Sequence, residues 1–296
     1  MAKKEKAFIA PNECSLGRWI AAALVGFVIG STISIPLEFY SKSNPDPIMG
    51  LPVSAITAIV SFCFIFICTV IAIRMIAKTS LKDFVIGVKG TVNKKDCLTV
   101  AVFYLIGYAI VTAMCAKYYQ LNQANAGEFA VLFVFMLLLC WMQTTWEEIV
   151  FRGLFIRWAC KNEIGYTKKA IICGIVSTLL FTIAHASNSE MATFSGAEKA
   201  LAMFAYAVPG FVMYFADLHF RSLLPGIVFH WINNFIAFVF VRMSDSSMPV
   251  STLFIDYTPR SAVNTAITHI ALYLPFALYI IFDLIRRKKA AAGAEN

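Results

Sequence analysis

The chain has 296 residues, of which 59% are hydrophobic and 14% are charged, and its formal net charge is +8. Soluble domains contain about 45 to 50% apolar and about 25% charged residues, so this composition excludes an ordinary soluble protein and favours an integral membrane protein. The positive charge does not indicate nucleic-acid binding, because the Lys and Arg residues lie between apolar runs rather than along one helix face.

Eight apolar runs approach or exceed the length of about 20 residues that a helix needs to cross a bilayer. They cover residues 19–39, 51–76, 97–117, 127–156, 168–187, 199–216, 223–241 and 262–285. We therefore predict an all-α fold, a polytopic bundle of about eight transmembrane helices, formed by a single membrane domain over residues 1–296. The first run exceeds the apolar core of about 7 to 15 residues of a cleaved signal peptide, so we expect it to be retained.

The Lys and Arg residues predict the orientation of this bundle. Cytoplasmic loops of membrane proteins carry an excess of positive residues. Most of the 25 Lys and Arg residues fall on one side of the predicted spans if the N-terminus is placed in the cytoplasm. Both termini are therefore expected in the cytoplasm. Because the loops are short and no organelle-type signal is found, we expect a multi-pass protein of a plasma membrane.

Two features of the N-terminal third predict local packing. Gly26 and Gly30 have the spacing of small residues that lets a second membrane helix approach closely. The segment 79–88, TSLKDFVIGV, is too short to cross the membrane and mixes apolar with charged residues. It is expected to lie at the cytoplasmic interface, with a simple connecting loop as the alternative.

The fourth predicted span contains three charged residues in the sequence QTTWEEIVFRG. A charge near the centre of a membrane helix costs about 2.5 to 3.5 kcal/mol on translocon scales, so these charges need partners or water. Glu148 and Arg152 have the four-residue spacing of an ion pair, which we predict as a supporting pair. Glu147 projects about 100° away from Glu148 and remains as a spare carboxylate suited to base chemistry. A purely structural charge network is the alternative.

The fifth and seventh spans contribute polar residues in the sequences LLFTIAHASN and PGIVFHWINNF. Tyr166 lies in the loop between the fourth and fifth spans and is equally far along the chain from Glu147 and His185, so we expect these two at the same depth. His230 and Asn234 are four residues apart and share one helix face. Each of these residues taken alone is also explained by a structural hydrogen bond between helices.

The signatures EEIVFRG, FTIAH and HWINN, in this order, resemble the EExxxR, FxxxH and HxxxN pattern of the CAAX-prenyl protease and bacteriocin-processing family of intramembrane endopeptidases. The resemblance covers residues 126–240, which it marks as the catalytic core. It implies that Glu147 and His185 activate a water molecule and that His230 and Asn234 stabilise the oxyanion.

We therefore expect a glutamic endopeptidase that hydrolyses a peptide bond of a membrane-associated protein or peptide. Its partners would be membrane lipid and a protein or peptide substrate, but no nucleic acid. Prenylated proteins, peptide pheromones, and leader or bacteriocin precursors all remain open as substrates. No cofactor is expected, because HExxH is absent and the eight cysteines lack paired ligand spacing.

Three alternatives remain open. The same residues could serve a zinc-dependent metalloprotease. The chain could be a non-catalytic membrane scaffold. It could also be a transporter, which the sequence disfavours because an ion relay spreads its titratable groups across the bilayer. His219 and His269 lie outside the signatures and are expected to be interfacial or packing residues.

Overall fold

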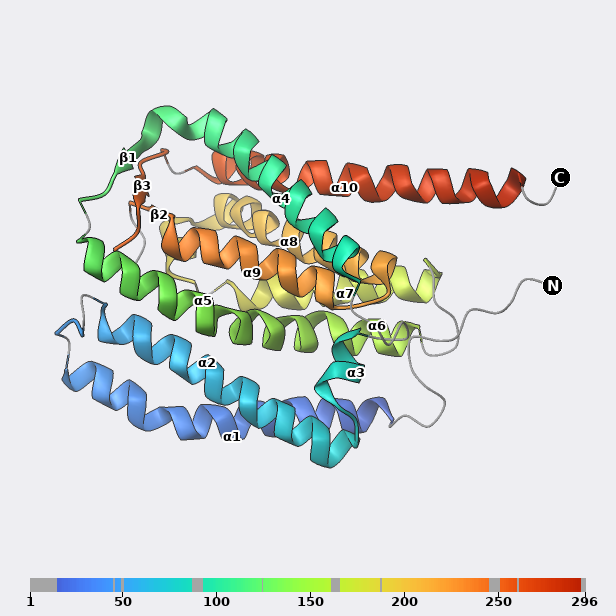
Figure 1. The fold of residues 1–296 in the computed structure, drawn as a ribbon, viewed down its shortest axis with the longest axis horizontal. Coiled ribbons are helices and arrows are strands. Elements are labelled where there is room, and N and C mark those ends of the chain that lie inside the picture. Colours follow the sequence, from blue (N-terminus) through green and yellow to red (C-terminus); the bar gives the residue numbers. More distant parts are fainter. Residues whose placement is uncertain are drawn as a thin grey trace.

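The structure is a computed structural model that describes residues 15–44, 46–48, 51–86, 93–123, 125–160, 166–186, 188–244, 251–259 and 261–293. Long helices dominate it and run side by side (Figure 1). They are α1 (Leu16–Ser43), α2 (Val53–Ala72), α4 (Lys94–Cys115), α5 (Ala126–Glu148), α7 (Lys168–Ala184), α8 (Gly196–Phe220), α9 (Leu224–Val239) and α10 (Ala262–Gly293). The short helical elements are η1 (Ile73–Ala77), α3 (Leu81–Ile86), η3 (Ala116–Tyr118), η4 (Ile149–Gly153), α6 (Leu154–Ala159) and η5 (Ser189–Thr193).

The predicted helical membrane bundle is confirmed, because each of the eight apolar runs coincides with a long helix. Within the described ranges, six helices are long and apolar enough to cross a membrane by length and composition. The other two are shorter than predicted: α7 has 17 residues and α9 has 16. Large apolar side chains such as Leu24, Ile183 and Phe282 are exposed on the outer faces. Lipid accepts such faces, whereas water penalises them.

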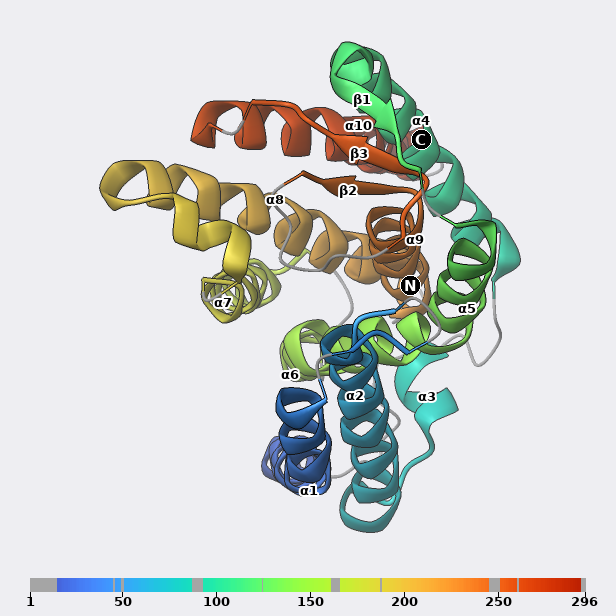
Figure 2. The same cartoon turned by 90° about the vertical axis from the view of Figure 1, so that its left-hand side faces the viewer.

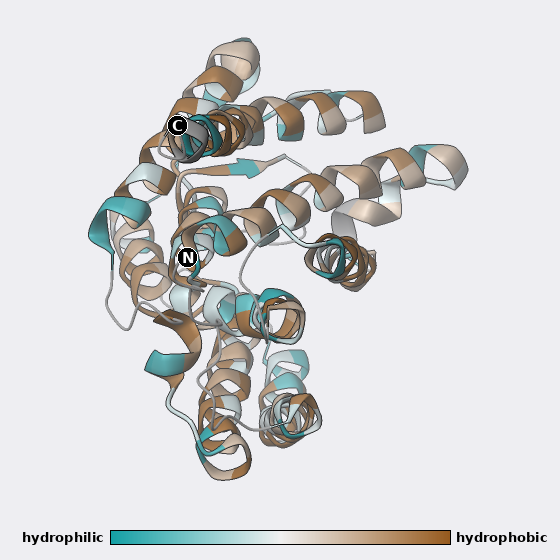
Figure 3. Ribbon diagram, turned by 90° about the vertical axis from the view of Figure 1, so that its right-hand side faces the viewer, coloured by the Kyte–Doolittle hydropathy of each residue, from teal (hydrophilic) through white to brown (hydrophobic). Residues whose placement is uncertain are grey.

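The helices form three groups across the bundle. Figure 2 shows α5, α7, α8 and α9 in the middle, with α1 and α2 on one side and α4 and α10 on the other. The start of α1 and the end of α10 lie at the same end of the bundle, together with the lysine-bearing starts of α4 and α7 (Figure 1). Figure 3 looks onto this end and shows hydrophilic residues at the helix termini and hydrophobic residues along the helix flanks.

A small sheet covers the opposite end of the bundle (Figures 1 and 2). Its strands are β1 (Tyr119–Leu121), β2 (Val241–Met243) and β3 (Phe254–Asp256). The order is β1-β3-β2, with β1 antiparallel and β2 parallel to β3. The sequence analysis did not predict this sheet, because strands of three residues are too short to show an alternating apolar pattern. It joins the end of α4 to the connection between α9 and α10.

The two glycines of α1 allow α2 to approach closely. A Cβ atom on Gly26 would lie 2.4 Å from the Cα of Thr69, and one on Gly30 would lie 2.4 Å from the Cα of Ile65. Any larger residue would therefore push the two backbones apart. The close approach that was expected from this spacing is confirmed, and α2 is the partner helix.

The segment 79–88 contains the helix α3 rather than a simple loop, and its last two residues lie outside the described ranges. The buried ring of Phe84 packs against Trp19 of α1, with 4.5 Å between the ring centroids. The guanidinium of Arg157 in α6 donates hydrogen bonds to the carbonyl oxygens of Asp83 at 2.8 Å and Phe84 at 2.6 Å. These contacts attach α3 to α1 and to α6, the last part of the helical stretch that contains the fourth predicted span.

Candidate active site

The signature EEIVFRG lies where α5 passes into a π-helical turn. Ala126–Ala159 is one continuous helical stretch of 34 residues, and η4 begins directly after Glu148. Single π-turns inside α-helices occur frequently at functional sites. The hydroxyl of Ser177 in α7 donates a hydrogen bond to the carbonyl of Phe151, so the turn is held against α7. Glu147 is 6% exposed, and Glu148 and Arg152 are fully buried.

Glu148 joins the two helices that carry the first and third signatures. Its Oε1 lies 3.2 Å from a guanidinium nitrogen of Arg152 and accepts a hydrogen bond from Nδ1 of His230 at 2.7 Å. Arg152 also stacks over the ring of Phe181, with 3.9 Å from its Cζ to the centroid. Buried charges are tolerated when they are paired in this way. Because a carboxylate only accepts, Nδ1 of His230 must be protonated, which leaves Nε2 to face the other glutamate.

Glu147 faces that second nitrogen of His230. Its Oε2 lies 3.6 Å from Nε2 of His230, while its Oε1 accepts a hydrogen bond from Nε2 of Gln143 at 3.1 Å. In the described part of the chain, the buried Oε2 has no hydrogen-bond donor. A buried acceptor without a donor is uncommon and calls for an explanation, such as a catalytic role or a bound water. The two glutamates therefore lie at the two nitrogens of one imidazole.

His185 lies beside this cluster at the end of α7. Its Nδ1 donates a hydrogen bond to the carbonyl of Phe181 at 2.7 Å, and its ring lies 4.2 Å from that of Phe181 and 4.9 Å from that of Tyr206. The ring of Phe181 is in turn 6.1 Å from that of His230. Glu147 is close enough for its charge to act on His185, but the two share no hydrogen bond among the described contacts. Nδ1 of His185 is therefore engaged by a backbone carbonyl oxygen rather than by Glu147.

Asn234 is held by a hydrogen-bond network that the sequence analysis missed. Its Oδ1 accepts from Nδ2 of Asn233 at 3.0 Å. The Oδ1 of Asn233 accepts from the hydroxyls of Tyr104 in α4 at 3.2 Å and Tyr273 in α10 at 3.1 Å. The pair of asparagines in an apolar helix could have marked Asn233. Nothing in the sequence distinguishes the two tyrosines from the others.

Asp217 of α8 is a second residue that the sequence analysis missed. It is fully buried, and its Oδ1 accepts a hydrogen bond from the backbone N–H of Gly226 at 3.0 Å, in the first turn of α9. A carboxylate is favourable there because the N-terminal end of a helix carries partial positive charge. The fields of both Glu148 and Arg152 act on it. The sequence analysis missed it because it lies one residue beyond the predicted span 199–216. An Asp beside an apolar run could nevertheless have indicated a buried polar residue.

The two histidines outside the signatures lie apart from this cluster. His219 has Nε2 3.0 Å from Asp283 and Nδ1 3.3 Å from the hydroxyl of Tyr166, in a polar network at the end of α8 and α10. His269 donates through Nδ1 to the carbonyl of Thr265 at 2.8 Å. Over the described ranges, neither hydrogen-bonds to Glu147 or His230. Burial raises the pKa of the Tyr166 phenol in that network.

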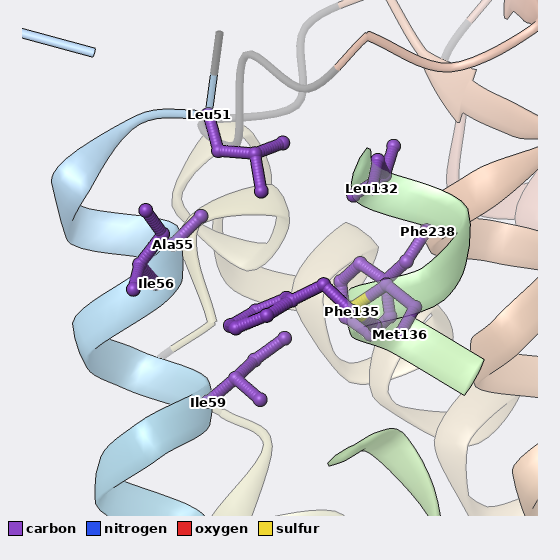
Figure 4. A pocket seen from close by; sticks show the side chains of 8 residues that line it. All are labelled: Leu51, Ala55, Ile56, Ile59, Leu132, Phe135, Met136 and Phe238. Carbon is purple, nitrogen blue, oxygen red and sulfur yellow. The ribbon is translucent and has the colours of Figure 1, made fainter. Parts of the chain in front are cut away.

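Two further observations concern where a metal ion or another ligand could bind. Among the residues that the structure describes, no three His, Cys, Asp or Glu side chains are grouped so as to hold a metal ion. A recess between α2, α5 and α9 is lined only by apolar side chains (Figure 4). They belong to Leu51, Ala55, Ile56, Ile59, Leu132, Phe135, Met136 and Phe238. This recess contains none of the candidate site residues and offers no group for chemistry.

Comparison with known families gives a match for the middle of the chain. Residues 129–236 match the family model described as type II CAAX prenyl endopeptidase, Rce1-like. This stretch contains all three signatures, so the resemblance inferred from them is confirmed there. No curated protein and no solved structure matched the chain.

Proposed function

We propose, from the premise that residues 129–236 form an Rce1-like CAAX-protease domain, that the chain is an intramembrane glutamic endopeptidase. It hydrolyses a peptide bond of a membrane-associated protein or peptide. The observation that carries the proposal is the buried Glu147 carboxylate, whose Oε2 has no hydrogen-bond donor among the described residues and lies 3.6 Å from Nε2 of His230. Amide hydrolysis needs such a base beside groups that can donate to the carbonyl oxygen under attack.

Glu147 acts as the base in the proposed reaction. Its Oε2 accepts a proton from water, and the water oxygen attacks the carbonyl carbon of the substrate. The unprotonated Nε2 of His185 is a second acceptor for this water, because Nδ1 already donates to the carbonyl of Phe181. When the tetrahedral intermediate collapses, the C–N bond breaks and Glu147 returns the proton to the departing amine.

His230 and Asn234 stabilise the negative charge that forms on the carbonyl oxygen. Nδ1 of His230 already donates to Glu148, so Nε2 can donate to the oxyanion only in the imidazolium form. The charge of that form is balanced by Glu148 and by the oxyanion itself, since Glu147 has by then taken up the proton of the water. The amide nitrogen of Asn234 supplies the second donor. Losing one donor of this kind typically lowers kcat by about 100 to 1000 fold.

The orientation in the membrane is part of the proposal. Both described ends of the chain lie at one end of the bundle, where the lysine-bearing starts of α4 and α7 also lie (Figure 1). By the excess of positive residues in cytoplasmic loops, this end faces the cytoplasm of a plasma membrane. The cluster around Glu147 then lies inside the bilayer, where it meets substrates that are themselves anchored there.

A cleavage assay with purified protein in nanodiscs tests the proposal. The probes are an internally quenched peptide that ends in an S-farnesylated Cys-aliphatic-aliphatic-X sequence, the same peptide without the lipid, and a leader-type peptide. Products are identified by mass spectrometry. We expect Glu147→Gln to abolish cleavage and Glu198→Gln, an exposed glutamate at the start of α8, to leave it unchanged. Full activity in Glu147→Gln would exclude the proposed base.

The same assay separates the zinc-dependent alternative. Under the glutamic mechanism, dialysis of the protein against 1,10-phenanthroline leaves the rate unchanged. Loss of activity that added zinc restores would replace this mechanism by a metal-dependent one with the same side chains.

A further inference from the structure

The side-chain amide of Asn234 must adopt one of two orientations of nearly identical shape. Only its nitrogen can donate to an oxyanion, whereas its oxygen would repel one. Rotation by half a turn about the Cβ–Cγ bond exchanges the two atoms. The side chain of Asn234 alone does not choose between them, so the choice depends on its neighbours.

The hydrogen bonds of Asn233 determine which way the side-chain amide of Asn234 is oriented. The hydroxyls of Tyr104 and Tyr273, whose residues are 2% and 3% exposed, both reach the same atom of Asn233, at 3.2 and 3.1 Å. A buried hydroxyl that finds no acceptor is costly, so the atom that meets both hydroxyl protons is the carbonyl oxygen. The nitrogen of Asn233 then points to the other side, where it donates to Oδ1 of Asn234 at 3.0 Å.

The same contacts leave Nδ2 of Asn234 available. Its Oδ1 is occupied by Asn233, and no acceptor for its Nδ2 is found in the described part of the structure. The two tyrosine rings are held in place by packing on Phe229, with centroid distances of 5.0 Å to Tyr104 and 5.2 Å to Tyr273. The network is therefore anchored by α4 and α10.

We propose that Asn233, fixed by Tyr104 and Tyr273, is a positioning residue that locks the amide of Asn234 with Nδ2 towards the reacting carbonyl. The catalytic consequence rests on the proposed function, whereas the orientation does not. Tyr104 and Tyr273 both lie outside the stretch 129–236 that matches the Rce1-like family. Helices outside that stretch thus contribute to the geometry of the oxyanion donors.

A measurement without substrate tests the orientation. Protein labelled with ¹⁵N-asparagine in nanodiscs gives side-chain amide signals by NMR, and the signal of Asn234 is identified by its loss in Asn234→Asp. We expect this signal to shift in the double variant Tyr104→Phe/Tyr273→Phe and in Asn233→Ala. Tyr108→Phe is the matched control, because Tyr108 lies one turn along α4, stacks on Tyr104 and has no contact with Asn233 among the described residues. An unchanged Asn234 signal in the double variant overturns the proposal.

A kinetic measurement tests the consequence with the farnesylated quenched peptide. We expect kcat of the double variant to fall about tenfold with KM unchanged, since the lost hydrogen bonds are weaker than a lost oxyanion donor. In the background of Asn234→Ala, the same two changes should cause no further loss, because they act through Asn234. An equal loss in both backgrounds would assign the tyrosines a merely structural role and reject the proposal.

The experiments distinguish a failure of the proposed function from a failure of the positioning role. If wild-type protein cleaves none of the peptides, the proposed function fails, and the NMR measurement alone decides whether the network orients Asn234. If wild type cleaves the farnesylated peptide and the double variant keeps full kcat, the positioning role fails while the peptidase stands. Thermal melting of each variant in nanodiscs confirms that the Tyr→Phe changes leave the fold intact.

Discussion

Nδ1 of His230 donates a hydrogen bond to Oε1 of Glu148 at 2.7 Å, across 82 positions of the sequence. The same carboxylate oxygen also faces Arg152 at 3.2 Å. Glu148 therefore does more than neutralise its neighbour on the same helix. It fixes the ring of His230 and joins α5, which carries the proposed base, to α9, which carries the proposed oxyanion donors.

Replacing Glu148 tests this double role. In Glu148→Gln, buried Arg152 loses the carboxylate charge that lies 3.2 Å from it, and His230 loses the carboxylate that holds its ring. Hydrogen bonds to charged groups contribute about 1.5 to 3 kcal/mol each, so we expect a lower melting temperature as well as a loss of cleavage. The control is Glu198→Gln, which changes an exposed glutamate. A variant with normal melting temperature and normal kcat would show that Glu148 does not join the two helices.

Glu147→Gln should behave in the opposite way with respect to stability. The Oε2 of Glu147 is buried and has no hydrogen-bond donor among the described residues, so its charge costs free energy in the folded state. A neutral amide of the same size removes that cost. We expect the melting temperature to stay the same or rise while cleavage is lost. If melting temperature falls as far as in Glu148→Gln, the three charged residues form a structural network instead.

The helical fold and the cluster of buried charges could be predicted from the sequence because both depend on local contrast. Apolar runs of membrane length stand out from the short polar loops between them. Glu147, Glu148 and Arg152 stand out inside one such run, since charges in lipid are costly. The four-residue spacing of Glu148 and Arg152 is likewise local, and the structure places them in contact.

The contacts between helices that assemble the candidate site could not be predicted in the same way, because they depend on the rotation and depth of each helix. Counting from Tyr166 assumed two helices of equal length, but α5 continues through η4 and α6 to Ala159 while α7 ends at Ala184. Among the described contacts, the imidazole that faces Glu147 is that of His230, at 3.6 Å, whereas Nδ1 of His185 donates to the backbone carbonyl of Phe181. The π-turn η4 also shifts the helix rotation after Glu148, which no residue pattern indicates.

The contact between α1 and α2 gives a test that does not involve the site. In Gly26→Ala, the new Cβ would lie 2.4 Å from the Cα of Thr69, and backbone cannot yield as a flexible side chain can. Overpacking of this kind typically costs about 1 to 3 kcal/mol. Gly17→Ala is the matched control in the same helix, because its Cβ would meet only Oγ of Ser15 at 3.9 Å. We expect a lower melting temperature for Gly26→Ala alone, and equal melting temperatures would contradict the close approach.

Asp217 offers the last test, because it links α8 to the helix that carries His230 and Asn234. Its carboxylate accepts the N–H of Gly226, and a Cβ on that glycine would lie 2.4 Å from Oδ1, so the contact leaves no room for another residue. Asp217→Asn keeps an oxygen that can accept this N–H but removes the charge, whereas Asp217→Ala removes both. Loss of a helix-capping acceptor costs about 0.5 to 2 kcal/mol.

We therefore expect Asp217→Ala to lower the melting temperature and kcat together, since α9 loses the contact that holds its first turn. Asp217→Asn should retain most of both, because the hydrogen bond to Gly226 rather than the charge holds the helix. If Asp217→Asn is as damaging as Asp217→Ala, the charge itself is required. The carboxylate would then act through the field that it shares with Glu148 and Arg152, not through the first turn of α9.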